Sequence, residues 1–303
     1  MECPAQPAPC DEYGLTYVKG HGTRNDFVIL PDPAGELDLT PRLVRALCDR
    51  RAGIGADGVL RVVRTRAAGP EVAERAAGAE WFMDYRNADG SVASMCGNGI
   101  RVFVAFCARA GWIASHAGDP VPVATRGGVR LVRLVGDGRL TVDMGPAVVG
   151  GEPAPVTVTA GHATGPATVV HMPNPHAVTF VDALDAPGPL TSPPAVHPSE
   201  AFPDGANVEF VVVAGVGQVA MRVHERGVGE TLSCGTGACA AAVAARRRAG
   251  LGPTDDAQRD WQVDTRGGRL TVRERADGHV ELTGPAELVA TGHVSAEWVR
   301  EHS

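Results

Sequence analysis

The sequence predicts an α/β (α+β) fold of two pseudo-symmetric domains, each a strongly bent mixed sheet or barrel wrapped around a central buried helix. Three observations lead to this prediction: motifs that recur in order, an apolar helix after the first motif of each set, and short apolar runs bounded by glycine and proline. The 303 residues, 44% of them hydrophobic, can bury two cores of ordinary domain size.

Three short motifs occur twice, in the same order and at nearly the same offset. Residues 94–99 read SMCGNG and residues 232–237 read LSCGTG; residues 125–128 and 265–268 both read TRGG; residues 144–147 read MGPA and residues 283–286 read TGPA. A single repeated Gly-Pro pair would arise by chance, but the ordered set of three indicates an internal duplication.

The elements between these motifs also agree. After each Cys-Gly-x-Gly we expect a buried helix, at residues 100–109 and 238–249, because neither segment shows a polar face over its first turns. Apolar or alternating runs predict strands at residues 27–30, 59–63, 131–134 and 140–144, and again at 177–181, 208–213, 219–223, 270–273 and 280–282. The two Arg-Gly-Gly triplets would connect strand pairs, since glycine adopts the positive φ that tight turns need.

The repeat also places the domains. We expect a flexible N-terminal extension at residues 1–14, which are rich in proline and alanine. An N-terminal domain is expected at 15–143 and a C-terminal domain at 144–286. Residues 287–303 follow the second copy and are expected to complete the N-terminal domain.

Composition excludes several classes of partner. The net charge of −7 comes from mixed acidic and basic residues, which argues against a nucleic-acid partner. No apolar run approaches the roughly 20 residues that span a bilayer, and no signal peptide is expected, so no membrane partner is predicted. The seven cysteines lack disulfide-scaffold or zinc-site spacing, which favours a cytoplasmic protein with reduced thiols and no metal.

Two cysteines, Cys96 and Cys234, are candidates for chemistry because each opens a Cys-Gly-x-Gly motif at a helix start. The N–H groups and dipole there favour an anion, which is expected to lower the thiol pKa from about 8.5. The same N–H groups could hold a carboxylate. A single such cysteine would more often be a small buried residue, as expected for Cys48, Cys107 and Cys239.

A pair of thiols, one ionised and one protonated, can supply a base on one face of a carbon and an acid on the other. Helix N-termini aimed at a carboxylate would stabilise the developing carbanion. Neither a pyridoxal-type lysine motif nor a metal site is evident, so no cofactor is expected. The duplicated pair therefore predicts inversion of a carbon that bears a proton in a small-molecule substrate.

From about Tyr17 to Val294 the chain resembles the diaminopimelate epimerase family. The motifs that carry the resemblance are HGTRNDF at 21–27, GIGADG at 53–58, NADGS at 87–91, MCGNG at 95–99, NPH at 174–176, ANVEF at 206–210, ERGVGET at 225–231 and SCGTGA at 233–238. Each is weak alone, but their ordered union is specific. At two positions where members often have glycine, the chain has Arg24 and Pro173; Arg24 would alter the local loop and adds charge near Asn25.

The resemblance implies interconversion of LL- and meso-2,6-diaminopimelate, in lysine and cell-wall precursor synthesis, by a homodimeric enzyme without a cofactor. Cys96 would take the proton from the LL substrate and Cys234 would return one on the other face. Glu225 and His176 would assist beside the cysteines. The substrate-binding set would be Asn25, Asn87, Gly97, Asn98, Asn174, Asn207, Glu225, Arg226, Gly235 and Thr236.

Other interpretations stay open at this stage. The asparagines lie near turn residues, where asparagine often serves the backbone, and His176 could be a satisfied structural histidine. Arg226 beside Glu225 could be a solvated surface pair. The alternative function within the same fold is a proline or hydroxyproline racemase with two cysteines; from other classes, we consider a redox-sensing disulfide and a non-catalytic binding protein.

Overall fold

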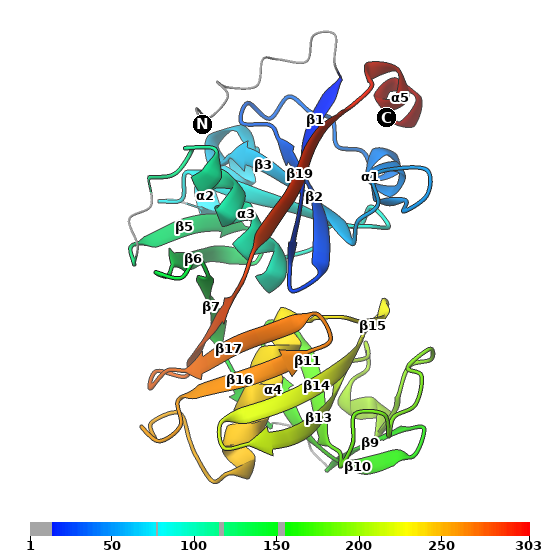
Figure 1. The fold of residues 1–303 in the computed structure, drawn as a ribbon, viewed down its shortest axis with the longest axis vertical. Coiled ribbons are helices and arrows are strands. Elements are labelled where there is room, and N and C mark those ends of the chain that lie inside the picture. The colour runs from blue at the N-terminus through cyan, green and yellow to red at the C-terminus, as the bar shows by residue number, and fades with distance from the viewer. Residues whose placement is uncertain (1–13, 77, 115–117, 151–154) are drawn as a thin grey trace. The chain divides into compact units, whose positions relative to one another are not determined.

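The computed structural model of this chain describes residues 14–76, 78–114, 118–150 and 155–303 (Figure 1). The expected extension at 1–14 lies outside the described residues except for Gly14. The chain divides into two compact units, Met1–Val142 with Pro285–Ser303, and Asp143–Gly284. We call them unit 1 and unit 2.

Unit 1 begins with two strands and ends with a strand and a helix from the C-terminus. Its elements are β1 (Leu15–Gly22), β2 (Asn25–Pro31), α1 (Pro41–Cys48), β3 (Gly58–Arg64), η1 (Thr65–Ala67), α2 (Pro70–Arg75), β4 (Trp81–Asn87), α3 (Gly97–Arg109), β5 (Pro120–Thr125), β6 (Gly128–Leu134), β7 (Leu140–Pro146, which runs on into unit 2), β19 (Glu287–Val294) and α5 (Ala296–His302).

Unit 2 is continuous in sequence. Its elements are β8 (Val148–Val149), β9 (Val156–Ala160), β10 (Ala163–His171), β11 (Pro175–Phe180), β12 (Ala195–His197), η2 (Ser199–Ala201), β13 (Asn207–Gly215), β14 (Gln218–Glu225), β15 (Gly229–Thr231), α4 (Gly235–Arg248), β16 (Asp260–Thr265), β17 (Gly268–Glu274) and β18 (His279–Gly284).

The pairing of strands recurs in the two units. In unit 1, β1–β2 is antiparallel, β2–β3 parallel, β3–β4 antiparallel, β4–β5 parallel, and β5–β6 and β6–β7 are antiparallel. In unit 2, the strands β10, β11, β13, β14, β16, β17 and β18 follow the same order of orientations. The mixed α+β fold and its duplication, predicted from three motifs, are therefore present in the topology.

One long helix lies inside each sheet. Helix α3 contacts β1, β2, β3, β4, β6 and β19, and α4 contacts β10, β11, β13, β14, β16, β17 and β18. Every residue from Gly97 to Val104 is buried, and so are Ala238 to Ala245. Both helices begin three residues before the predicted starts because the glycines of Cys-Gly-x-Gly already belong to the first turn.

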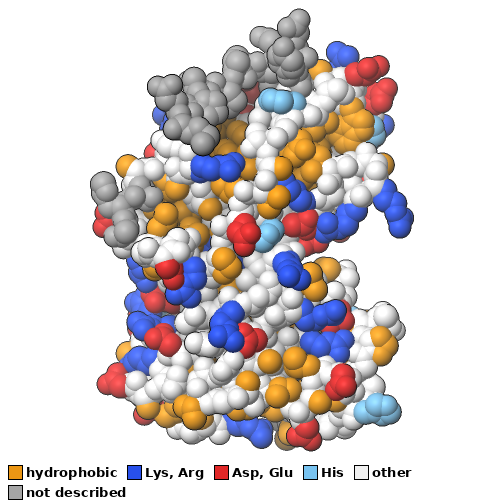
Figure 2. Space-filling model, in the orientation of Figure 1, with side chains coloured by type: hydrophobic (Ala, Val, Ile, Leu, Met, Phe, Trp, Pro, Cys, Tyr) orange, Lys and Arg blue, Asp and Glu red, His pale blue; other side chains and the backbone are white. Residues whose placement is uncertain are grey.

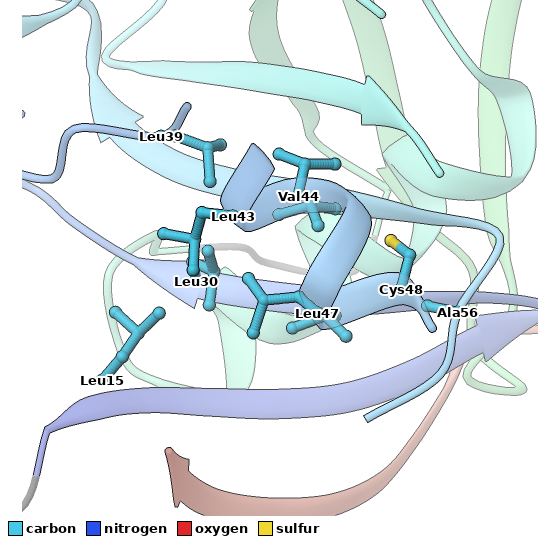
Figure 3. Close-up of a cluster of buried hydrophobic side chains, with 10 residues drawn as sticks. Leu15, Leu30, Leu39, Leu43, Val44, Leu47, Cys48 and Ala56 are labelled. Carbon is cyan, nitrogen blue, oxygen red and sulfur yellow. The ribbon is translucent and has the colours of Figure 1, made fainter. Parts of the chain in front are cut away.

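A second layer covers part of unit 1. Helix α1 places Leu43, Val44 and Leu47 against Leu15 and Leu30 from the sheet, as Figure 3 shows. Thr40 caps the helix by accepting from the Leu43 N–H, and Pro41 begins it, where the missing proline N–H costs nothing. This cluster of apolar side chains fixes the β1–β2–β3 part of the sheet from the side opposite α3.

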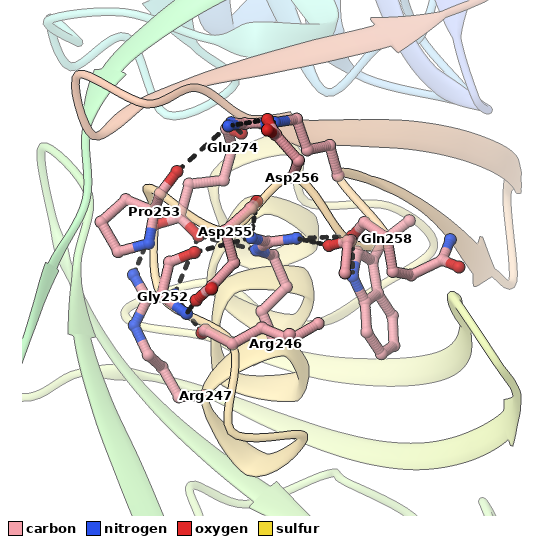
Figure 4. Close-up of polar contacts among 12 residues, drawn as sticks. Arg246, Arg247, Gly252, Pro253, Asp255, Asp256, Gln258 and Glu274 are labelled. Carbon is pink, nitrogen blue, oxygen red and sulfur yellow. Dashed lines mark hydrogen bonds and ion pairs between the residues drawn. The ribbon is translucent and has the colours of Figure 1, made fainter.

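A buried arginine connects the C-terminal end of α4 to its surroundings. Arg246 is 1% exposed; its Nε donates to Glu274 Oε2 at 2.9 Å, and its two terminal nitrogens donate to backbone carbonyls of the loop after the helix (Figure 4). Arg247 also binds the Glu274 carboxylate. The loop at residues 252–258 is thereby tied to the helix and to β17.

The surface carries both signs of charge. On the face in Figure 2, acidic and basic side chains are interspersed rather than gathered by sign. Within the described ranges, no helix combines the length and the apolar character that crossing a membrane requires.

Candidate active site

Cys96 and Cys234 occupy equivalent positions in the two units, each as the N-cap of its central helix. Their backbones are extended, with φ and ψ of −143° and 119° for Cys96 and −114° and 119° for Cys234. The Cys96 sulfur accepts the Gly99 N–H at 3.3 Å, and the Cys234 sulfur accepts the Gly237 N–H at 3.4 Å. The predicted placement of both thiols at helix starts is thus confirmed.

The second repeated motif positions the first. The Gly127 N–H, in the turn between β5 and β6, donates to the Ser94 carbonyl at 2.8 Å. The Gly267 N–H, in the turn between β16 and β17, donates to the Leu232 carbonyl at the same distance. Each contact fixes the backbone two residues before a cysteine. The two motifs therefore recur together because one hairpin turn holds each cysteine loop.

In unit 1, Asn25 links Cys96 to a charged cluster. Its Oδ1 lies 3.7 Å from the Cys96 sulfur and 3.3 Å from Asn98 Nδ2, and its Nδ2 donates to Asp57 Oδ2 at 2.8 Å. Arg50 binds Asp57 and Asp26, which fixes the acceptor in turn. Asn25 is thus held with its carbonyl oxygen directed at the thiol.

The fully buried side chain of Arg101 fixes the first turn of α3 by hydrogen bonds. Its Nη1 donates to the Gly97 carbonyl at 2.9 Å and its Nη2 to Asn98 Oδ1 at 2.8 Å, while Nε donates to the Pro285 carbonyl at 3.2 Å. The Asn98 side chain is buried and occupied by these contacts. A ligand would therefore meet Gly97 and Asn98 through their backbone, at the end where helical N–H groups point along the axis.

Asn87 and Arg24 both lie at turns between strands or loops. Asn87 ends β4, and its Nδ2 donates to Ser91 Oγ at 3.0 Å within the turn that follows. Arg24 is exposed and has a φ of 63° in the β1–β2 turn, next to Thr23 at 50°. A glycine at this position would suit such a turn better than arginine does.

In unit 2, Glu225 lies at the end of β14 beside Cys234. Burial raises the pKa of its carboxyl, while hydrogen bonds from the Thr231 hydroxyl and the Cys234 thiol oppose the rise. Thr236, in the first turn of α4, has its hydroxyl 3.4 Å from the Cys234 sulfur. The thiol is therefore surrounded by polar groups although it is only 6% exposed.

The expected lowering of the thiol pKa is wrong for Cys234. Burial raises its pKa well above the ordinary value, and the carboxylates of Glu225 and Glu209 add to the rise. A helix N-terminus stabilises an anion by about 0.3–2 kcal/mol, which is at most about 1.5 pH units, whereas burial shifts a pKa by up to about 3–5 units. The rise in the Cys234 pKa caused by burial beside two carboxylates therefore exceeds the lowering caused by the helix N-terminus.

His176 is fully buried and both ring nitrogens have partners. Nδ1 lies 2.7 Å from Glu209 Oε1, and Nε2 lies 3.1 Å from Asn174 Oδ1. The histidine thus orients Asn174 and Glu209. Glu209 is a residue to which the sequence analysis gave no role; the only signal was its place in the ANVEF motif of an otherwise apolar strand.

Asn207 and Arg226 are joined through the backbone. Asn207 Oδ1 accepts the Arg226 N–H at 2.9 Å, and Arg226 Nη1 donates to the carbonyls of Asp204 and Gly205 at 3.1 and 3.2 Å. The Arg226 side chain is exposed and makes these contacts rather than a surface pair with Glu225.

The remaining described cysteines are core residues, as predicted. Cys48, Cys107 and Cys239 are buried, and burial raises the pKa of Cys48 to about 12. Among residues the structure describes, no group of three or more His, Cys, Asp or Glu side chains is arranged to hold a metal ion.

Comparisons with known proteins identify the family. The profile of the family described as diaminopimelate epimerase matches residues 17–150 and 168–289. A protein named diaminopimelate epimerase from Streptomyces coelicolor is 55% identical over 287 residues, covering 94% of this chain and 97% of that protein. Another of the same name from Thermobifida fusca is 49% identical, covering 94% of this chain and 100% of that protein.

Solved structures with a similar fold are more distant. A PhzF-family phenazine biosynthesis protein from Bacillus anthracis has a TM-score of 0.67 at 14% identity, covering 92% of this chain and 98% of that one. A probable proline racemase from Agrobacterium radiobacter has the same score and identity, covering 93% of each chain. These likenesses show the fold alone, whereas identities of 49–55% over nearly the whole length place this chain in the diaminopimelate epimerase family of isomerases.

Proposed function

We propose that this chain interconverts LL- and meso-2,6-diaminopimelate by two-base α-proton transfer, in which one of Cys96 and Cys234 removes the α-proton and the other donates a proton to the opposite face. The observation that carries the proposal is the identical construction of the two cysteines, each capping a buried helix and held by its own hairpin turn. Relatives that bear the substrate in their name support its identity. The mechanism requires both sulfurs to reach one carbon.

The two thiols would share the proton transfer. Cys96 removes the α-proton of the LL isomer, and Cys234 donates a proton to the opposite face; the roles reverse for the meso isomer. The backbone N–H groups of Gly97, Asn98, Gly235 and Thr236 would hold the reacting carboxylate and stabilise the carbanion. Their place in the first turns of α3 and α4 supports this role.

The remaining expected residues would hold the rest of the substrate. Glu225 would accept the α-ammonium, and His176 would assist by fixing Asn174. At the distal amino-acid end, the proposed ligands are Asn25, Asn87, Asn174, Asn207 and Arg226. Exposed Arg226 could grip a carboxylate bidentately after leaving the two backbone carbonyls it now contacts.

We also propose that the reaction needs no cofactor. Lys19 is the single lysine of the sequence, and its ammonium is paired with Asp26 at 2.6 Å and bonded to the Gly55 carbonyl. A Schiff base with pyridoxal phosphate needs an available lysine amine. This engagement supports chemistry carried by the thiols.

The assembly and location are part of the same proposal. We propose a cytoplasmic homodimer with no nucleic-acid or membrane partner, in which the expected domains 15–143 with 287–303, and 144–286, each supply one cysteine. Three observations support the proposal: two compact units with nearly these bounds, the free thiols of the five cysteines among the described residues, and interspersed charge on the face in Figure 2. Sedimentation velocity measures the dimer; a monomer at assay concentration would refute it.

Epimerisation of pure LL-diaminopimelate tests the function. Without added cofactor and with a chelator present, chiral chromatography should detect the meso isomer. Cys96→Ser and Cys234→Ser should each lose at least about a hundredfold in turnover, because each removes an acid–base group. Cys239→Ala, which alters a core cysteine in the same helix as Cys234, should stay active. Full activity in either serine variant would refute the mechanism, and turnover of proline instead would favour the racemase alternative.

A further inference from the structure

Glu209, on β13, is a fully buried residue that is not among the expected catalytic or substrate-binding residues. Its Oε1 lies 2.7 Å from His176 Nδ1, and its Oε2 is buried with no hydrogen-bond partner among the described residues. Buried carboxyl oxygens are normally satisfied, so one that is not calls for a reason.

The Glu209 side chain reaches the first turn of α4. A Cβ added at Gly237 would lie 2.7 Å from Glu209 Oε1 and 3.4 Å from the Cys234 sulfur. The Gly237 N–H donates to that same sulfur. The carboxyl and the thiol therefore meet at one glycine, which leaves room for both because it has no side chain.

His176 fixes the direction of this carboxyl. An amide oxygen only accepts hydrogen bonds, so His176 Nε2, which faces Asn174 Oδ1, carries a hydrogen. The other ring nitrogen, Nδ1, lies within hydrogen-bond distance of Glu209 Oε1, at 2.7 Å. Glu209 is thereby anchored through one oxygen, and its position relative to Cys234 is set by β11 and β13 rather than by the helix.

Two carboxyl groups act on Cys234, and they act differently. Glu225 on β14 accepts a hydrogen bond from the thiol, which suits a group that binds beside the reacting carbon. Burial raises the pKa of Cys234 most, the Glu225 charge adds to the rise, and the Glu209 charge adds further through its field, while Thr236 and the Gly237 N–H oppose the rise. His176 influences the Cys234 thiol by orienting the Glu209 carboxyl.

We propose that Glu209 is a positioning residue that keeps the Cys234 sulfur protonated in the substrate-free enzyme, ready as the proton donor for the LL isomer. The inference deepens the proposed function and depends on it for its chemical meaning. It assigns the resting proton to Cys234 and leaves Cys96 as the thiol that starts the reaction.

A titration of the full-length protein tests the proposal. Cysteine labelled with ¹³C at Cβ reports ionisation through its chemical shift, and Cys234→Ser assigns the resonance. In the wild type, Cys234 should remain mostly a thiol at pH 9. In Glu209→Gln, which keeps the shape and can donate an amide N–H to His176 Nδ1, its midpoint should fall by about one pH unit or more.

Two further variants separate charge from packing. Glu209→Asp retains the carboxylate and should leave the Cys234 midpoint closer to wild type than Glu209→Gln does. Asp264→Asn removes a carboxylate on β16 that is paired with Arg269 on β17, and it should not move the midpoint. A midpoint unchanged in Glu209→Gln, or shifted equally in Glu209→Asp, would overturn the proposal.

The titration needs no substrate, so its failure is distinct from failure of the epimerase assay. Circular dichroism checks that each variant is folded. If Glu209→Gln does not fold, the wild-type titration decides, because a Cys234 thiol that is mostly ionised by pH 9 contradicts the proposal.

Discussion

Arg24 has a positive φ of 63°, which an L-residue other than glycine adopts at a cost of about 1–2 kcal/mol. Its side chain is exposed, so removing it loses little packing. We therefore expect Arg24→Gly to raise the free energy of unfolding by about 0.5–1 kcal/mol relative to Arg24→Ala, which lacks the charge but keeps the strain. Urea denaturation measures the difference; equal stabilities would contradict the argument.

The Asp26 carboxylate in unit 1 is paired with two cations, Lys19 and Arg50. Although burial alone would raise its pKa, these partners lower it from 3.8 to about 2. A lowered carboxyl pKa stabilises the folded state above the unfolded pKa, and that stability is lost as the pH falls from about 4 to 2.

Asp26→Asn should therefore reduce the free energy of unfolding at pH 7 by roughly 2 kcal/mol. The difference from wild type should shrink below pH 4. Asp137→Asn, at a solvent-exposed pair with Arg139, serves as control and should leave the free energy of unfolding nearly unchanged. A deficit of Asp26→Asn that persists undiminished at pH 2 would contradict the assignment.

At the scale of the element, the first turn of α4 leaves no space at Gly237. An added Cβ would lie 2.7 Å from Glu209 and 3.3 Å from the Cys234 Cβ. Gly237→Ala should cost about 1–3 kcal/mol of stability by overpacking. Gly215→Ala, where the Cβ would meet nothing within 4 Å, should cost less than about 0.5 kcal/mol. Thermal unfolding compares the two; equal losses would show that Gly237 has room.

At the other end of α4, Arg246 is a buried cation paired with Glu274. Replacing it leaves Glu274 with Arg247 as its remaining arginine partner and leaves several backbone carbonyls without their donor, so Arg246→Met should cost about 3–5 kcal/mol. Arg248→Met, which removes an exposed arginine stacked on Phe180, should cost below about 1 kcal/mol. Chemical denaturation that ranks the two variants the other way would contradict this account of the helix end.

Local sequence predicted the positions of helices α3 and α4, but it did not predict the burial or the pKa shifts of their ionisable side chains. The run of three arginines at 246–248 looks like a solvated face, yet the first is buried because the loop at 252–258 folds over it. The helix start at Cys234 was predicted, but its pKa direction was not, since Glu209 approaches from a strand 25 residues upstream. Such contacts depend on the tertiary fold and leave no local pattern.

At the scale of the whole molecule, duplication is what made the fold predictable. Two cysteine motifs and two hairpin turns recur because each turn must hold its cysteine loop, so the constraint is visible in sequence. Short elements outside the repeat, such as α1, α2 and α5, were not predicted, since their few apolar positions acquire meaning only against the sheets they cover.

The central claim is that two monoprotic thiols share one α-proton transfer, and the isotopic fate of that proton tests it most directly. LL-diaminopimelate is incubated with the protein in deuterated water, and both isomers are isolated early in the reaction for mass spectrometry. Two bases predict that meso product carries one deuterium at the inverted carbon while recovered LL substrate carries almost none. Product that retains the original proton, or substrate labelled as fast as product, would contradict the account.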